Sequence, residues 1–171
     1  TGLRSVQIRM NLEPTAVSVT SNRLNALNLY FDVTQSGLVV KQQSDVNSPI
    51  LVLDQLTTSV GNYLPAPQSK AVSIVRYLHY LWLKFASQQI NHDTLKITFS
   101  KQESALIPLQ TTKSAEDLVS ALQLIRSQAT IDSTQVQIDL RYNQPVVRDL
   151  TITITPTPVS TESAEIKNNL E

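Results

Sequence analysis

The sequence predicts an α+β fold, in which a mostly antiparallel sheet carries two helices packed on one face. Short segments with alternating apolar and polar residues recur along the chain, as expected of half-buried strands. Two longer segments instead place apolar residues at helical spacing. The resulting order is strands, helix, strands, helix, strands, which is typical of helices gathered on one side of a sheet.

The first part of the chain contains only strand-like segments. "RSVQIRM" alternates Val6, Ile8 and Met10 with polar residues, and "TAVSVTS" resumes the alternation after "NLEP". "LYFDVTQSGLVVKQ" predicts a hairpin, because Gly37 can adopt the positive φ that a short loop requires. "DVNSPILVLDQL" is an apolar run behind a turn, and it predicts a strand or a buried extended segment.

The first helix is predicted near residues 69–89. Pro65 and Pro67 precede it, and Ser69 can serve as its N-cap. After it, "DTLKITFSK" restores the strand alternation, and "SALIPLQ" adds a short strand that Pro108 places at an edge or a bulge. The helix has a stripe of apolar residues formed by Ala71, Ile74, Val75, Leu78, Leu81, Trp82 and Phe85.

The second helix is predicted near residues 114–128. Ser114 and Asp117 have the spacing of a capping box at its start. Its buried stripe consists of Leu118, Ala121, Leu122 and Ile125. Together the two helices predict a core that contains Ile74, Leu78, Leu122 and Ile125.

The last strand pair is predicted in "TQVQIDLRYNQPVVRDLTITITP". Before the turn at Asn143-Gln144-Pro145, apolar residues alternate up to Tyr142. After the turn, Leu150 begins an apolar face opposite Asp149. From residue 156 the chain is rich in Pro, Thr and Ser and then charged, without periodicity, so we expect a disordered tail over 156–171.

Composition excludes several classes of function. Fourteen basic and fourteen acidic residues give a formal net charge of zero, so the chain as a whole has no basic excess to attract a nucleic-acid backbone or anionic lipid. The chain has no cysteine, which rules out disulfides, thiolate nucleophiles and cysteine zinc sites. Its three glycines lie far apart and form no phosphate-binding loop. We therefore expect no cofactor.

The two histidines are the remaining candidates for chemistry. His79 lies within the first predicted helix, and no nucleophile or carboxylate stands at helical spacing from it, so a surface position is the better interpretation than a general base. His92 and Asp93 form an adjacent pair that could bind a metal, but a turn organised by Asp93 explains them better. We predict no catalytic and no metal-binding residues.

Several strings resemble the extracytoplasmic region of the FtsQ/DivIB family of bacterial cell-division proteins. "VQIRMNLEPTAVSVTSNR" is similar to the end of that family's POTRA domain. "YFDVTQSGLVV" matches its hairpin at Asp32 and Gly37, and "VQIDLRY" matches a late strand at Asp139, Leu140, Arg141 and Tyr142. The acidic-Arg-Pro string that is frequent in the family is replaced by Asn22-Arg23-Leu24.

The resemblance implies a division of the chain into three parts. Residues 1–25 would end a POTRA-like domain, 26–155 would form the β domain, and 156–171 would be the tail. The family is anchored in the cell membrane by one transmembrane helix, with this region outside the cytoplasm. That helix and most of the POTRA domain would lie upstream of Thr1, whose surroundings read as the middle of a strand.

The resemblance also implies a non-catalytic scaffold of the divisome, active in septum formation. Such proteins bind FtsB/DivIC and FtsL-type partners by adding a partner strand to their C-terminal edge strand, which is β-augmentation. The predicted last strand has Pro145 at its start and no strand after it, so its edge must be paired, blunted or used. The residues expected to bind a partner are Tyr142, Asn143, Val146, Val147, Asp149 and Thr151.

Alternatives remain at this point. Tyr142 could anchor a partner or could plug the core, and the two interpretations are about equally supported. The chain could be another extracytoplasmic POTRA-type adaptor. A hydrolase with a dispersed site around His79 or His92 is the least supported alternative.

Overall fold

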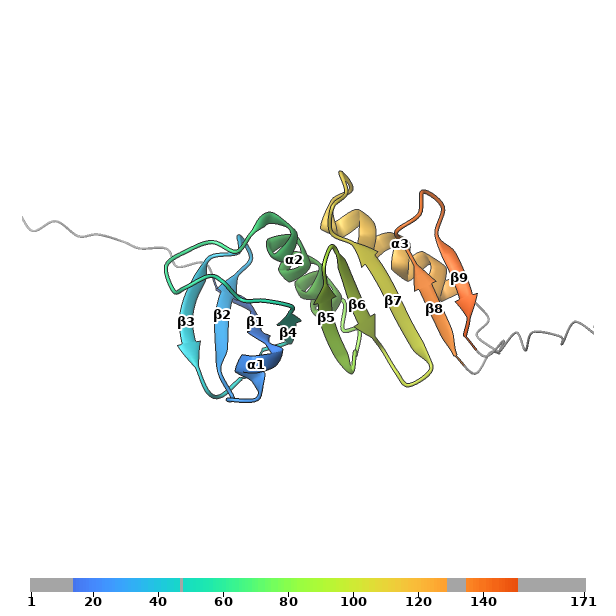
Figure 1. Ribbon diagram of the computed structural model, residues 1–171. Helices are drawn as coiled ribbons and strands as arrows, with labels where there is room; N and C mark the ends of the chain where they lie inside the picture. Colours follow the sequence, from blue (N-terminus) through green and yellow to red (C-terminus); the bar gives the residue numbers. More distant parts are fainter. Residues whose placement is uncertain (1–13, 47, 129–134, 151–171) are drawn as a thin grey trace, which may run out of the picture.

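The computed structural model describes residues 14–46, 48–128 and 135–150. Within these ranges one nine-stranded sheet runs in the order β3-β2-β1-β4-β5-β6-β7-β8-β9 (Figure 1). The strands are β1 (Thr15–Ser21), β2 (Tyr30–Thr34), β3 (Val39–Gln43), β4 (Ile50–Leu53), β5 (Ser87–Asn91), β6 (Thr94–Thr98), β7 (Glu103–Pro108), β8 (Val136–Asp139) and β9 (Val146–Asp149), and the helices are α1 (Asn22–Asn25), α2 (Ala66–Tyr80) and α3 (Ala115–Gln128).

The fold is α+β, but the prediction of a mostly antiparallel sheet with two helices is wrong. The sheet is mixed, because β1 pairs with β4, β4 with β5, and β7 with β8 in parallel. Two of these parallel pairs follow from the helices between them. Each long helix returns the chain to the end of the sheet where the preceding strand began, so the flanking strands run in the same direction. The structure also contains the short helix α1.

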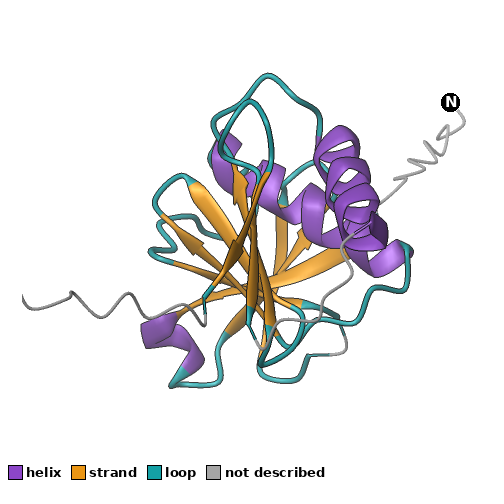
Figure 2. Cartoon of the chain, turned by 90° about the vertical axis from the view of Figure 1, so that its right-hand side faces the viewer, coloured by secondary structure: helices purple, strands orange, loops and turns teal. Residues whose placement is uncertain are grey.

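The two long helices lie against each other on one side of the sheet, and α1 lies away from them (Figure 2). Beneath them, one continuous core joins residues of both helices and of β1 to β8. Ile74, Leu78 and Leu122 are fully buried, as predicted. Ile125 is only partly buried and packs at the border of this core.

The helix α2 differs at both ends from the predicted range of 69–89. It begins at Ala66 behind Pro65, and no side chain caps it, so Ser69 is not the N-cap. Ser69 instead donates a hydrogen bond to the carbonyl of Ser36. The helix ends at Tyr80, and the following residues form a turn and then β5. Leu81 and Trp82 therefore lie outside the buried stripe.

The helix α3 begins as the sequence predicts. Ser114 Oγ accepts a hydrogen bond from the Asp117 amide at 3.0 Å, and the Asp117 carboxylate accepts one from the Ser114 amide at 3.2 Å. This is the reciprocal arrangement of a capping box. The hydrogen bonds from Ser114 lower the pKa of the Asp117 carboxyl.

The predicted hairpin at Gly37 is confirmed. β2 and β3 pair antiparallel around it, and Gly37 has a φ of +90°. A Cβ atom at this position would lie 2.5 Å from Ser69 Oγ. Glycine is needed here both for its backbone conformation and for the close approach of α2.

Some strand predictions need correction or cannot be compared. Pro108 ends β7, which is an interior strand between β6 and β8 rather than an edge. The segments "RSVQIRM" and 156–171 lie outside the described residues. β1, assigned by resemblance to the end of a POTRA-like domain, pairs with β2 and β4 within the single sheet. The division at residue 25 stays a prediction.

Candidate functional site

The best candidate for a functional site is the edge of the sheet formed by β9. This strand pairs antiparallel with β8, and among the described residues no strand pairs with its other side. All four residues of β9 are exposed, and none of them belongs to the core. The residues of β9 are therefore accessible on both faces, and no described strand covers its outer edge.

The direction of the main-chain groups of β9 follows from its register. The amide of Leu150 donates to the carbonyl of Gln135 at 2.9 Å. In an antiparallel pair this direction alternates along the strand, so the amide and carbonyl of Arg148 also face β8. The main-chain groups of Val147 and Asp149 then face away from β8. A partner strand added to this edge would bond to the main-chain groups of Val147.

The opposite edge of the sheet, at β3, is blunted. The Val39 amide donates to the carbonyl of Asn62, and the Gly61 amide donates to the carbonyl of Val39. Tyr63 forms a bridge with Leu38 just before the strand. Lys41 lies within β3 itself, and a lysine on an edge strand discourages pairing with another strand. Among the described residues, β9 is therefore the edge strand without such main-chain bonds on its outer side.

The turn between β8 and β9 is built around the buried carboxylate of Asp139. Its side chain is fully buried, while the side chains of Arg141 and Arg148 are 40% and 43% exposed. Arg141 donates Nε to Oδ1 at 2.9 Å and a terminal guanidinium nitrogen to Oδ2 at 2.7 Å. A terminal guanidinium nitrogen of Arg148 lies 3.5 Å from Oδ2 of Asp139. The Asp139 carboxylate thus holds the turn and β9 together.

The environment of Asp139 also determines its ionisation. The hydrogen bonds from the Arg141 side chain lower the pKa of the Asp139 carboxyl, and this effect exceeds the opposing effect of burial. The same interaction raises the pKa of Arg141. The carboxylate is therefore ionised throughout the neutral pH range.

The predicted late strand is shorter than its alternation indicated. β8 ends at Asp139, whose Oδ1 accepts the amide of Arg141 at 3.1 Å. This bond within the chain favours a turn over continuation of the strand. Tyr142 consequently lies in the turn and is 49% exposed, so it is not a core plug.

The other predicted partner-binding residues lie close to this turn. Asn143 is exposed in the turn, and Val146, Val147 and Asp149 are exposed on β9. Thr151 lies outside the described residues. No residue of β9 is buried, although Val147 lies opposite the core residue Ile138 and therefore on the same face of the sheet.

Sequence reasoning missed the role of Arg148. Its guanidinium donates to the Tyr142 hydroxyl at 2.9 Å, and its central carbon lies 5.7 Å from the centroid of that ring. The structure thus brings Tyr142, Arg148 and Asp139 together across the hairpin. Pairing of residues across the predicted turn could have indicated this cluster, because Arg148 lies opposite Gln137, two residues before Asp139.

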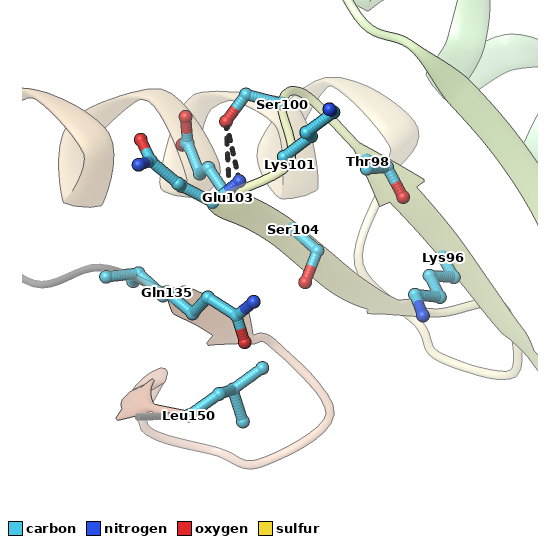
Figure 3. A pocket seen from close by; sticks show the side chains of 10 residues that line it. Lys96, Thr98, Ser100, Lys101, Glu103, Ser104, Gln135 and Leu150 are labelled. Carbon is cyan, nitrogen blue, oxygen red and sulfur yellow. Dashed lines mark hydrogen bonds between the residues drawn. The ribbon is translucent and has the colours of Figure 1, made fainter. Parts of the chain in front are cut away.

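A small hollow of about 180 Å³ lies beside the end of β9 (Figure 3). Lys96, Thr98 and Ser104 line it from β6 and β7, together with Gln135 and Leu150. Lys96 alternates with the buried Leu95 and Ile97, so the hollow opens on the face of the sheet opposite the core. The one carboxylate in its lining, Glu103, is bound by Arg126, which leaves no acid–base pair in the hollow.

The two histidines form no centre for chemistry in the described part of the chain. His79 is exposed on α2. His92 has a φ of +52° in the tight turn between β5 and β6, where its amide donates to Asp54 Oδ2. Within the described ranges no group of three or more His, Cys, Asp or Glu residues is placed to hold a metal ion. No helix in these ranges is long and apolar enough to cross a membrane.

Comparison with known proteins adds no assignment. The sequence matches no protein-family model and no curated protein.

Proposed function

We propose that this chain is a non-catalytic scaffold of the bacterial division machinery, which binds FtsB/DivIC and FtsL-type partners by β-augmentation at β9. The observation that carries the proposal is the outer edge of β9, with which no strand of the described residues pairs and along which every residue is exposed. The resemblance of the hairpin at Asp32 and Gly37 and of "IDLRY" to the FtsQ/DivIB family supplies the class of partner. In this proposal a transmembrane helix upstream of this region anchors the protein in the cell membrane, and the region itself lies outside the cytoplasm.

The structure supports the mode of binding in two ways. Strand addition needs main-chain groups that face outward, and the register of β9 directs those of Val147 and Asp149 away from β8. Selectivity needs side chains that flank the edge, and Tyr142, Arg148 and Val146 are exposed beside it. Tyr142 is the proposed anchor, because Arg148 restrains its ring and aromatic side chains dominate interface energetics.

The test compares two changes at Val147. Val147→Pro removes an amide that faces outward and leaves the ladder to β8 intact, whereas Val147→Ala keeps the amide and removes most of the side chain. We expect Val147→Pro to weaken binding of FtsB/DivIC- and FtsL-type extracytoplasmic segments by about tenfold or more, through lost main-chain bonds and steric exclusion of the partner strand. Val147→Ala should have a much smaller effect.

The measurement is titration calorimetry with the purified segments, alongside thermal unfolding of each variant. Both variants should melt close to the wild-type temperature, because Val147 is not in the core. Equal binding by Val147→Pro and wild type would exclude the edge as the docking site. Absence of any binding to these segments would exclude the division partners.

A further inference from the structure

The turn that ends α2 carries an unusual residue. Trp82 has a φ of +56°, and its side chain is 90% exposed. The Trp82 amide donates to the carbonyl of His79, and the Leu83 amide donates to the carbonyl of Leu78. This pair of bonds is a Schellman motif, in which the residue at Trp82's position is usually glycine. A bulky side chain there strains the backbone and is buried against nothing in the described chain.

The two residues before Trp82 in the sequence are also exposed. Tyr80 is 77% exposed and Leu81 is 37% exposed. A hollow of about 510 Å³ lies beside Trp82, lined by Pro49, Trp82, Phe85 and neighbouring residues. We call Tyr80, Leu81, Trp82 and Lys84 the α2-end surface. Exposed aromatic residues grouped in this way mark an interaction site rather than ordinary surface.

The described Lys, Arg, Asp and Glu residues that line the hollows beside Trp82 and Tyr80 are all basic. From Gln55 to His92 the sequence contains no Asp or Glu, although the whole chain has fourteen acidic residues. The same stretch contains Lys70, Arg76 and Lys84. Lys84 lines the hollow beside Trp82, and Arg76 lines a second hollow beside Tyr80. Within the described part of the chain, no carboxylate lines either hollow.

We infer that the α2-end surface binds the interface of a lipid bilayer that contains anionic lipid. Tryptophan and tyrosine favour the boundary between headgroups and acyl chains, and nearby lysine and arginine residues attract anionic headgroups. A second copy of this chain fits less well, because it would bring the same cations against each other. This inference goes beyond the proposed function and does not depend on it.

The strain at Trp82 supplies a discriminating variant. Trp82→Gly deletes the aromatic side chain and places the favoured residue in the turn, so it should unfold at the same or a higher temperature than wild type. It should also bind anionic vesicles about tenfold more weakly, since a large apolar contact is lost. If Trp82 served only stability, its replacement would not leave the unfolding temperature unchanged or higher while weakening vesicle binding.

Two further variants separate charge from apolar contact. Lys84→Glu should weaken binding by more than about fivefold, because one lysine near an anionic surface contributes about 1 kcal/mol and reversal adds repulsion. Leu150→Ser is the matched control. It removes an exposed apolar side chain just after β9, which β6, β7 and β8 separate from β5, and should leave vesicle binding unchanged.

The experiment uses the full 171-residue chain with vesicles of phosphatidylcholine, with or without phosphatidylglycerol. Trp82 is the single tryptophan, so its fluorescence reports this surface directly. We expect its emission to shift to shorter wavelength with the anionic vesicles and less with phosphatidylcholine alone, and sedimentation to rank the variants as stated. No shift and no sedimentation with anionic vesicles would overturn the inference, as would equal sedimentation of Trp82→Gly and wild type.

Discussion

Replacing Asp139 by asparagine tests whether its carboxylate holds the β8–β9 hairpin. The substitution keeps the size of the side chain and one carbonyl oxygen, but it removes the charge. It also turns an amide donor toward guanidinium groups that have only donors. Arg141 would lose its two-point contact, and Arg148 would lose its ion pair at 3.5 Å.

The size of the effect follows from burial on each side of the contact. A hydrogen bond to a charged group contributes about 1.5–3 kcal/mol, and breaking a fully buried ion pair costs about 3–5 kcal/mol. The Asp139 side chain is buried, but both arginine side chains remain partly exposed and can bind water instead. We therefore expect Asp139→Asn to lower the free energy of unfolding by about 2–3 kcal/mol.

Urea unfolding at neutral pH measures this loss, with Asp45→Asn as a control for removing a carboxylate from an exposed position elsewhere in the chain. The pH dependence provides a second readout. The pKa of the folded Asp139 carboxyl lies below its unfolded value of about 3.9. Its contribution is therefore complete above that pH and is lost as the pH falls through the folded pKa.

Asp139→Asn and wild type should accordingly converge in stability on acidification below about pH 4. A loss within about 0.5 kcal/mol at neutral pH would refute the reasoning, because that is the range of ordinary surface substitutions. A difference that stays constant down to the acid transition would also refute it. Such a result would assign the effect to packing rather than to charge.

Two further predictions concern the core and the hairpin. Leu78→Ala or Leu122→Ala should lower the free energy of unfolding by about 2–5 kcal/mol, because both side chains are fully buried. Leu124→Ala on the exposed side of α3 should change it little, and equal effects in a urea titration would mean that the helices are not core elements. Gly37→Ala should destabilise more than Gly61→Ala, since both glycines have φ near +90° but only a Cβ at residue 37 would meet Ser69. Equal melting temperatures for the two alanine variants would remove the argument from close packing.

Much of the local structure could be predicted from short sequence patterns. The hairpin at Gly37 and the capping box of Ser114 and Asp117 each depend on a few neighbouring residues, and the structure contains both. The buried faces of the two long helices follow from helical periodicity, which correctly placed Leu78 and Leu122 in the core. These features need no knowledge of distant contacts.

Pairing direction and the end of α2 could not be predicted in the same way. Alternation defines the two faces of a strand but does not say which strand lies beside it, so the parallel neighbours of β4 were missed. Leu81, Trp82 and Phe85 continue the helical spacing beyond Tyr80, and no glycine marks the end of the helix. The positive φ of Trp82 becomes visible only when the backbone is known.

In the five residues "IDLRY" of the candidate site, one feature could be predicted from the sequence and another could not. Alternation in "IDLRY" extends the strand through Tyr142, but the Asp139 carboxylate accepts the amide of Arg141 and ends it. The residues that made the string recognisable are thus the ones that hold the turn in place.

The position of β9 and its pairing with a partner strand consequently depend on different chemical groups. Asp139 fixes where β9 lies through side chains on the β8–β9 hairpin, whereas a partner strand would bond to main-chain groups that face away from β8. Removing the Asp139 carboxylate should therefore weaken partner binding only because it loosens the hairpin. The loss of affinity should follow the loss in the free energy of unfolding. Blocking the Val147 amide should weaken binding while stability is retained. This difference follows from strand addition, in which main-chain bonds supply affinity and the exposed side chains of the strand supply selectivity.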